Sequence, residues 1–217
     1  MLANHRENNK KFILAIHSTN DYFGFGYKYL DSYKIVDNIL IKKLDKDLSK
    51  YLITSLSEFL DQKKVQCIER IAISIGPANF NASRQITVCA RAISQQINCS
   101  LDIYSSFQLM AKRIATKHLS IQDNQPFWIF RKLKRRGYIV GKYKIKDFIN
   151  ESEFLIQEMN SPQLYKKLSM EKNHFEAQYD IKNELQELLF LSSINAKNLI
   201  FNHWEKALPI YPIGPIN

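Results

Sequence analysis

The residues best placed to do chemistry surround the pair Gly76-Pro77. An apolar run from Ile71 to Ile75 ends at this pair, which is a strong turn signal. Asn79 and Asn81 follow the turn and are good candidates for a helix N-cap. The pattern predicts a buried strand, a tight loop and a helix, and the free N–H groups of such a loop are suited to binding an anion. A plain connection between a strand and a helix explains the same pattern.

The other polar residues do not form the pattern of a catalytic or metal site. The five histidines are scattered, without a second histidine or a cysteine at metal-ligand spacing. The sequence has no G-x-G-x-x-G, P-loop or G-x-S-x-G pattern. The three cysteines, Cys67, Cys89 and Cys99, also lack ligand spacing, and their odd number is typical of buried thiols in a reducing cytoplasm. We therefore expect no metal, no cofactor and no catalytic residue.

The chain is strongly basic. Its 217 residues include 31 Lys and Arg against 21 Asp and Glu, which gives a formal charge of +10. Such a charge favours contact with RNA, DNA or an acidic partner, although a solvated surface explains it equally well. A basic run at the tip of a predicted hairpin supplies candidate RNA contacts, with a solvated turn as the alternative. These candidates are Lys132, Lys134, Arg135 and Arg136. Few aromatic residues lie near the run, which argues against a stacking platform for bases.

Residues 1–115 are predicted to form an N-terminal subdomain with the element order β-β-β-α-β-α-β-α. Short apolar or alternating runs predict the strands, and apolar residues at helical spacing predict the helices. The predicted strands are Lys11–Ile16, Tyr22–Leu30, Ser32–Leu40, the run ending at Gly76, and Ser100–Tyr104. The predicted helices are Leu44–Leu60, Asn81–Ile97 and Phe107–Ala115, the last capped by Ser105-Ser106.

Residues 116–217 are predicted to form a smaller, divergent C-terminal subdomain, because the chain turns polar between Thr116 and Gln125. Its expected elements are a hairpin with a basic tip, an edge strand, two helices and an extended tail. They cover Pro126–Phe130 and Gly137–Ile145 (hairpin), Glu153–Ile156 (edge strand), Ser161–Leu168 and Asn183–Leu191 (helices), and Leu208–Pro212 (tail).

Two of the predicted helices, Leu44–Leu60 and Asn81–Ile97, are apolar on more than one face. One face of each would cover the sheet, and the remainder could form a helical bundle with a partner. The candidate interface residues are Leu48, Leu52, Leu56, Ile86, Ala90 and Ile93. Complete burial of both helices within the monomer is the alternative.

The sequence resembles the bacterial TsaB family, also called YeaZ, most strongly from Phe12 to Ala115. The region around Gly76, Pro77, Asn79, Phe80 and Arg84 is similar to the family signature G-P-G-S-F-T-G-L-R, although most of its glycines are replaced and Asn79 departs from it. Phe12–Thr19, Tyr104-Ser105-Ser106, Arg135-Arg136-Gly137 and Pro209-Ile210-Tyr211 resemble further family segments. The aspartate of the family opening is replaced by His17. Because an imidazole cannot serve Mg²⁺ as a carboxylate does, we expect His17 to be a surface or packing residue.

The resemblance implies an α/β fold, a degenerate, two-subdomain form of the actin-like ATPase (ASKHA, ribonuclease H-like) fold. It implies an accessory subunit with little catalysis of its own, which binds and activates its paralogue TsaD. TsaD transfers a threonylcarbamoyl group to adenosine 37 of tRNAs that read ANN codons. The resemblance also implies TsaE, an ATPase, as a partner, and a homodimer through the same surface. The H-x-x-x-H metal pair of TsaD is absent from the sequence, which favours the accessory role.

Two other functions compete with this interpretation. A small ATPase or kinase of the actin-like superfamily would bind Mg-ATP tightly, but the loss of the aspartate at His17 argues against it. A general basic RNA-binding protein would bind tRNA with an affinity that falls with salt. The polar start of the chain lacks the apolar core of a signal peptide, and no apolar run approaches 18 residues, so we expect a cytoplasmic protein without a membrane span.

Overall fold

A computed structural model describes residues 10–44, 48–118, 125–150, 153–168 and 173–211. The chain divides into two compact units. Unit 1 holds the chain up to Tyr104 and again Asp180–Pro209, and unit 2 holds Ser105–Tyr179 and the end of the chain from Ile210. The division therefore differs from the single predicted boundary near residue 116, because the chain leaves unit 1 after Tyr104 and returns to it at Asp180.

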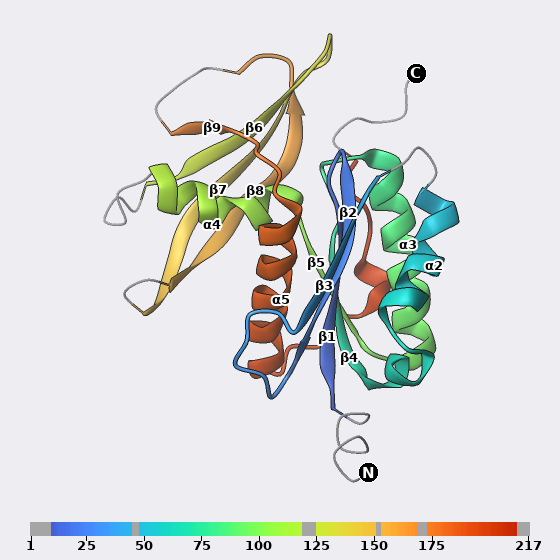
Figure 1. Cartoon of the computed structure of the whole chain (residues 1–217). Coiled ribbons are helices and arrows are strands. Elements are labelled where there is room, and N and C mark those ends of the chain that lie inside the picture. The colour runs from blue at the N-terminus through green and yellow to red at the C-terminus, as the bar shows by residue number, and fades with distance from the viewer. Residues whose placement is uncertain (1–9, 45–47, 119–124, 151–152, 169–172, 212–217) are drawn as a thin grey trace. The chain divides into compact units, whose positions relative to one another are not determined.

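Unit 1 is built on a five-stranded sheet with the order β3-β2-β1-β4-β5 (Figure 1). Its strands are β1 (Phe12–Ser18), β2 (Tyr22–Tyr29), β3 (Asn38–Lys43), β4 (Ile68–Ser74) and β5 (Ser100–Tyr104). The first three strands are an antiparallel meander, whereas β4 and β5 continue the sheet in parallel with β1. The central strand β1 is buried along its whole length, which agrees with its apolar run Phe12–Ile16, although the strand ends in the polar residues His17 and Ser18.

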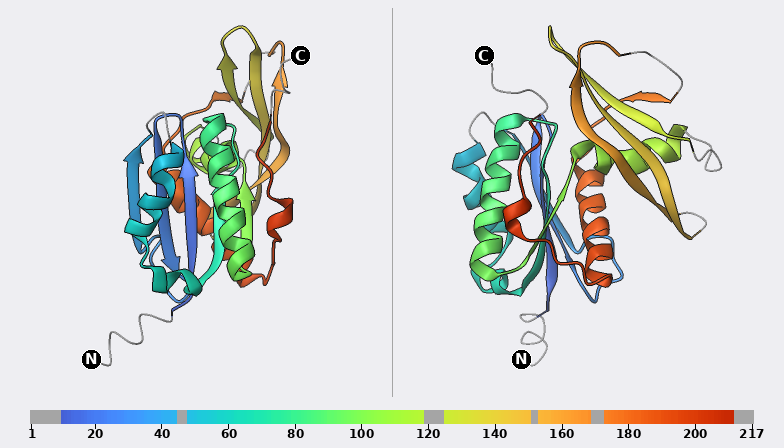
Figure 2. Two further views of the ribbon diagram at one scale, coloured as in Figure 1. Left: turned by 90° about the vertical axis from the view of Figure 1, so that its right-hand side faces the viewer. Right: turned by 180° about the vertical axis from the view of Figure 1, so that it is seen from behind.

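Helices cover both faces of this sheet (Figure 2). One face carries α2 (Leu48–Phe59) and α3 (Phe80–Ile97), and the other carries α5 (Ile181–Lys197). Two short 3₁₀ helices, Gln62–Cys67 and Trp204–Lys206, complete the unit. On the α5 face, Gly24 of β2 allows the close approach, since a Cβ there would lie 2.6 Å from the carbonyl oxygen of Leu40 and 3.1 Å from Leu185 Cδ1.

A buried ion pair fixes α5 and the segment after it to the sheet of unit 1. Arg70 of β4 donates two hydrogen bonds, of 2.9 and 2.8 Å, to the carboxylate of Asp102 on β5. Ser192 and Asn195 of α5 and the following Asn202 donate to the same carboxylate. The charge of Asp102 is therefore fully paired and hydrogen-bonded, as a buried carboxylate requires.

Unit 2 is a four-stranded sheet in the order β8-β7-β6-β9, with one helix of the described chain packed against it (Figure 1). The elements are α4 (Ser106–His118), β6 (Phe127–Leu133), β7 (Gly137–Asn150), β8 (Glu153–Tyr165) and β9 (His174–Glu176). The core between α4 and the sheet includes Phe107, Met110 and Ile114 of the helix and Phe127 and Tyr143 of the strands.

Most of the predicted helices and strands of unit 1 are confirmed. The clearest errors in this unit are the bounds of the third strand and of the first helix. The third strand is not Ser32–Leu40 but Asn38–Lys43, because Asp37 accepts from Tyr29 N and Ser32 Oγ and holds the chain between the strands in a loop. The first helix begins at Leu48 rather than Leu44, and residues 45–47 lie outside the described residues.

The helix predicted from Ser161 to Leu168 is wrong, because β8 continues through this segment to Tyr165. The Ser161 hydroxyl donates to Glu158 at 2.7 Å instead of capping a helix. Pro162 is tolerated there because β8 is an edge strand, where a missing N–H does not break the sheet. The strand predicted at Glu153–Ile156 is consequently the first part of a much longer one.

Candidate functional site

An apolar groove lies between α2 and α3 on the outer side of unit 1. Its volume is about 470 Å³. The groove is lined by Ser49, Leu52, Ile53, Asn81, Arg84, Gln85, Val88 and Cys89. Two of its apolar residues point outward, since Ile53 is 60% and Val88 68% exposed. Exposed aliphatic side chains on adjacent helices beside an apolar groove are typical of a surface that binds another protein.

The structure separates the six predicted interface residues into two groups. Leu48, Leu52, Ile86 and Ala90 are buried in the core of unit 1. Leu56 and Ile93 are half-buried. The four buried residues hold the helices to the sheet and to each other, and of these only Leu52 lines the groove.

The residues that a partner would meet first are therefore Ile53 and Val88. The sequence did contain a signal for them, because both are apolar residues outside the main stripe of their helix. Spacing alone did not tell which of the two apolar faces lies against the sheet.

The signature loop, the segment from Gly76 to Arg84 that resembles the TsaB signature, ends beside this groove. Gly76 has φ +97°, a conformation that favours glycine, and its bond to Pro77 is cis. Asn79 is the N-cap of α3 and accepts a 3.1 Å hydrogen bond from Ala82 N, as predicted, whereas Asn81 is exposed and lines the groove. The Arg84 guanidinium lies over the ring of Phe80, 5.5 Å from its centroid. Loop and groove thus share one face of α3, and the predicted anion site at this loop stays a prediction.

The polar turn after β1 is closed by its own side chains. Thr19 Oγ1 accepts from the N–H groups of Asp21 and Tyr22. His17 is completely buried, and its Nε2 lies 2.7 Å from Oε2 of the equally buried Glu184 on α5. The other carboxylate oxygen of Glu184 accepts from Asp180 N, at the start of α5.

His17 is therefore a packing residue in the interior, one of the two roles expected of it. Its Nδ1 has no hydrogen-bond partner among the residues that the structure describes. Glu184 is occupied by His17 and by the helix start, so it is not available to hold Mg²⁺. Among the described residues, no three His, Cys, Asp or Glu side chains gather into a metal-binding group.

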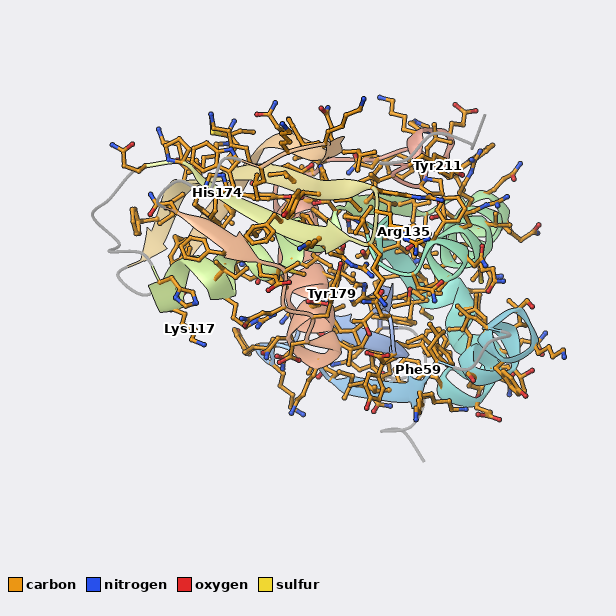
Figure 3. The ribbon with its side chains drawn as sticks, turned by 90° about the horizontal axis from the view of Figure 1, so that it is seen from above. Phe59, Lys117, Arg135, His174, Tyr179 and Tyr211 are labelled. Carbon is orange, nitrogen blue, oxygen red and sulfur yellow. The ribbon has the colours of Figure 1, made fainter. Side chains whose placement is uncertain are left out.

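The basic residues lie at the tip of the β6–β7 hairpin of unit 2, as predicted. Lys132 is in β6, and Lys134, Arg135 and Arg136 form the loop to β7; all four are exposed. Arg135 is labelled in Figure 3. Arg135 has φ +63° and Gly137 φ +103°, which closes the three-residue loop. Within the described part of the chain, none of these four side chains forms a salt bridge with a carboxylate.

The three cysteines are free and buried. Burial raises the pKa of the Cys89 thiol to about 11, although this residue lines the groove. A thiol with such a pKa carries little thiolate at neutral pH and is a poor nucleophile. Cys89 is therefore poorly suited to act as a nucleophile in the groove.

No family model and no curated protein matches the sequence. Solved structures do match. YeaZ from Pseudomonas aeruginosa has a TM-score of 0.67 at 13% identity, covering 93% of this chain and 99% of YeaZ. A crystal structure of an uncharacterized protein with similarity to peptidase YeaZ, also from Pseudomonas aeruginosa, has a TM-score of 0.66 at 12% identity, covering 94% of this chain and all of that one.

The chain thus has the YeaZ fold along nearly its whole length, and the predicted α/β class is confirmed. The resemblance to YeaZ found in short motifs extends to the fold over 93–94% of the chain. None of the helices in the described part of the chain is long and apolar enough to cross a bilayer.

Proposed function

We propose that this chain is a non-catalytic accessory subunit that binds and activates a TsaD-like enzyme in the threonylcarbamoylation of adenosine 37 of tRNAs reading ANN codons. The observation that carries the proposal is the α2–α3 groove, an apolar surface with exposed Ile53 and Val88, on a chain with the YeaZ fold. A paralogous enzyme would contribute its own pair of helices, so that four helices pack together with Ile53 and Val88 in the contact.

The surroundings of the groove suit a protein partner better than a small ligand. Its ends carry polar side chains, Ser49, Asn81 and Arg84, around an apolar centre, which is the arrangement of protein interfaces. The same surface would form a homodimer in the absence of the enzyme, and a TsaE-like ATPase would join the complex of the two. The tRNA would be reached through the complex, with the basic hairpin tip as one contact.

The proposal is tested by co-purifying the chain with the TsaD-like protein of its own organism. An Ile53→Asp, Val88→Asp variant places two charges in the groove, and we expect it to weaken the complex by more than about thirtyfold, because buried hot-spot contacts are each worth about 2 kcal/mol or more. Ile35→Asp is the matched control, since Ile35 is 63% exposed but lies in the loop before β3. This control should bind like the wild type.

Two results would overturn the proposal: a wild-type chain that forms no complex, or a groove variant that binds as well as the control. Hydrolysis of ATP by the isolated chain would then favour the small ATPase or kinase. The buried His17–Glu184 pair makes that alternative weaker, because the carboxylate beside the end of β1 is already held by His17 and by Asp180 N.

A further inference from the structure

The sheet of unit 2 has a pocket on the face opposite α4. The pocket has a volume of about 340 Å³, within the range of small-ligand sites. It is lined by Trp128, Val140, Gly141, Lys142, Asn160, Tyr165, Lys167, Leu168 and His174. The proposed function does not use it, and it lies in a different unit from the α2–α3 groove.

One row of side chains from all four strands forms the floor of this pocket. Asn160 of β8 pairs with Lys142 of β7, Lys142 with Trp128 of β6, and Trp128 with His174 of β9. Residues paired across a sheet project from the same face, so these four side chains lie side by side. The neighbours Phe127 and Tyr143 project to the other face, into the core under α4.

The aromatic residues of the row are held in place. The Trp128 and His174 rings are stacked, with centroids 4.9 Å apart and planes at 6°. The Lys142 ammonium lies 5.2 Å from the centroid of the Trp128 ring. Tyr165 at the rim is 45% exposed, so its ring is available to a ligand. The pocket therefore combines a fixed aromatic row with an accessible aromatic ring.

The charge of the pocket is positive and unbalanced. Lys142 and Lys167 line it, and neither forms a salt bridge in the described part of the chain; no carboxylate is among the lining residues. In β8, Glu158 is the acidic residue nearest in sequence to Asn160. Its carboxylate accepts hydrogen bonds from Ser105, Tyr143 and Ser161 on the other face. Unit 2 as a whole has 14 Lys and Arg against 7 Asp and Glu, so it carries most of the net charge of the chain.

We propose that this pocket binds an unpaired nucleotide of an RNA chain. The phosphate would pair with Lys142 and Lys167, the base would stack on Tyr165, and the Asn160 amide would bond to the base edge. A four-stranded sheet with aromatic side chains on an open face is a common means of binding single-stranded RNA. Lys132 lies on the same face of β6 as Trp128, so the basic hairpin tip continues the positive surface from the pocket.

The inference goes beyond the proposed function and is tested on the chain alone. The probe is a labelled single-stranded oligouridylate of about eight nucleotides, a length that one small RNA-binding domain covers. Binding is measured by fluorescence anisotropy. We expect Lys142→Gln, Lys167→Gln to weaken binding by more than about tenfold, because two phosphate contacts are lost. Lys112→Gln, Lys117→Gln removes two charges from α4 on the opposite face and should weaken it less than about threefold (Figure 3).

Variants of Tyr165 distinguish the contribution of base stacking to RNA binding from that of charge attraction. Tyr165→Ala should weaken binding by about tenfold, whereas Tyr165→Phe, which keeps the ring, should bind like the wild type. A second readout does not depend on these variants: in a Trp204→Phe background the remaining tryptophan, Trp128, should be quenched by the bound base.

Three outcomes would overturn the proposal. They are equal losses in the pocket and α4 variants, unchanged Trp128 fluorescence at saturation, and equal affinity for duplex RNA. A free nucleoside monophosphate is the competing source of the same chemistry, so uridine monophosphate is titrated in parallel. If it binds as tightly as the oligouridylate, the pocket is a mononucleotide site and the RNA assignment falls.

Discussion

The two sheets of the protein are covered in different ways. In unit 1, helices pack on both faces, and the polar residues inside are paired with one another. In unit 2, α4 covers one face, while the other carries a row of aromatic and basic side chains around a pocket. Unit 1 thus carries an apolar groove between two helices, and unit 2 carries a basic pocket on the face of a sheet. On the two proposals above, the groove would bind a protein and the pocket a nucleic acid.

The largest expected effect on stability concerns the buried Arg70–Asp102 ion pair of unit 1. Asp102→Ala removes the carboxylate that pairs with Arg70 and should lower the free energy of unfolding by about 3–5 kcal/mol, because it leaves a buried cation unpaired. Asp147→Ala in unit 2 removes an exposed partner of Lys146 and should change it by less than about 1 kcal/mol. Urea unfolding of both variants measures the difference. Equal effects would mean that Asp102 does not hold unit 1 together.

A smaller loss in the free energy of unfolding is expected at the His17–Glu184 pair, beside the turn after β1. Glu184→Ala removes the hydrogen-bond partner of His17 and should cost about 1–3 kcal/mol, the usual penalty for a buried polar group left unsatisfied. A His17→Leu, Glu184→Met double variant should recover part of the loss, since an apolar pair of similar volume needs no partner. Thermal unfolding gives the values. A double variant less stable than Glu184→Ala would contradict this account.

A variant at the same turn distinguishes the accessory subunit from the ATPase alternative. His17→Asp restores the carboxylate usual in the family, yet we expect no Mg-ATP binding, because the new carboxylate would lie in the core beside Glu184. Two buried carboxylates repel each other, so this variant should also be less stable than the wild type. Calorimetric titration with Mg-ATP is the measurement. Tight binding would revive the ATPase alternative.

The sequence predicted unit 1 better than unit 2 for a physical reason. Strands such as β1 and β4 are buried along almost their whole length, so their apolar runs are unambiguous. In unit 2, β8 lies at an edge and contains Ser161-Pro162, which resembles the start of a helix. Local patterns decide correctly where burial is continuous and fail where an edge strand tolerates polar residues and proline.

The sites depended on contacts that local patterns do not contain. Asp102 and Asn195 are 93 residues apart in sequence, so the return of α5 to unit 1 was not visible from spacing. The floor of the pocket of unit 2 takes one residue from each of four strands, and its aromatic residues Trp128 and His174 lie outside the basic run. The expectation that no stacking platform lies near the basic run stays a prediction, and the proposed base-binding pocket is an alternative to it.

The smallest effect on stability is expected at the hairpin tip, where only binding should change. Lys134→Gln, Arg135→Asn, Arg136→Gln should leave the free energy of unfolding within about 0.5 kcal/mol of the wild type, because all three side chains are exposed. Asparagine is chosen at Arg135 because it tolerates the positive φ of this position. If the tip contacts RNA phosphates, the slope of log affinity for single-stranded RNA against log salt should become shallower by about 2, since each phosphate contact contributes about 0.7. An unchanged slope would confine RNA binding to the pocket and make the tip a solvated turn.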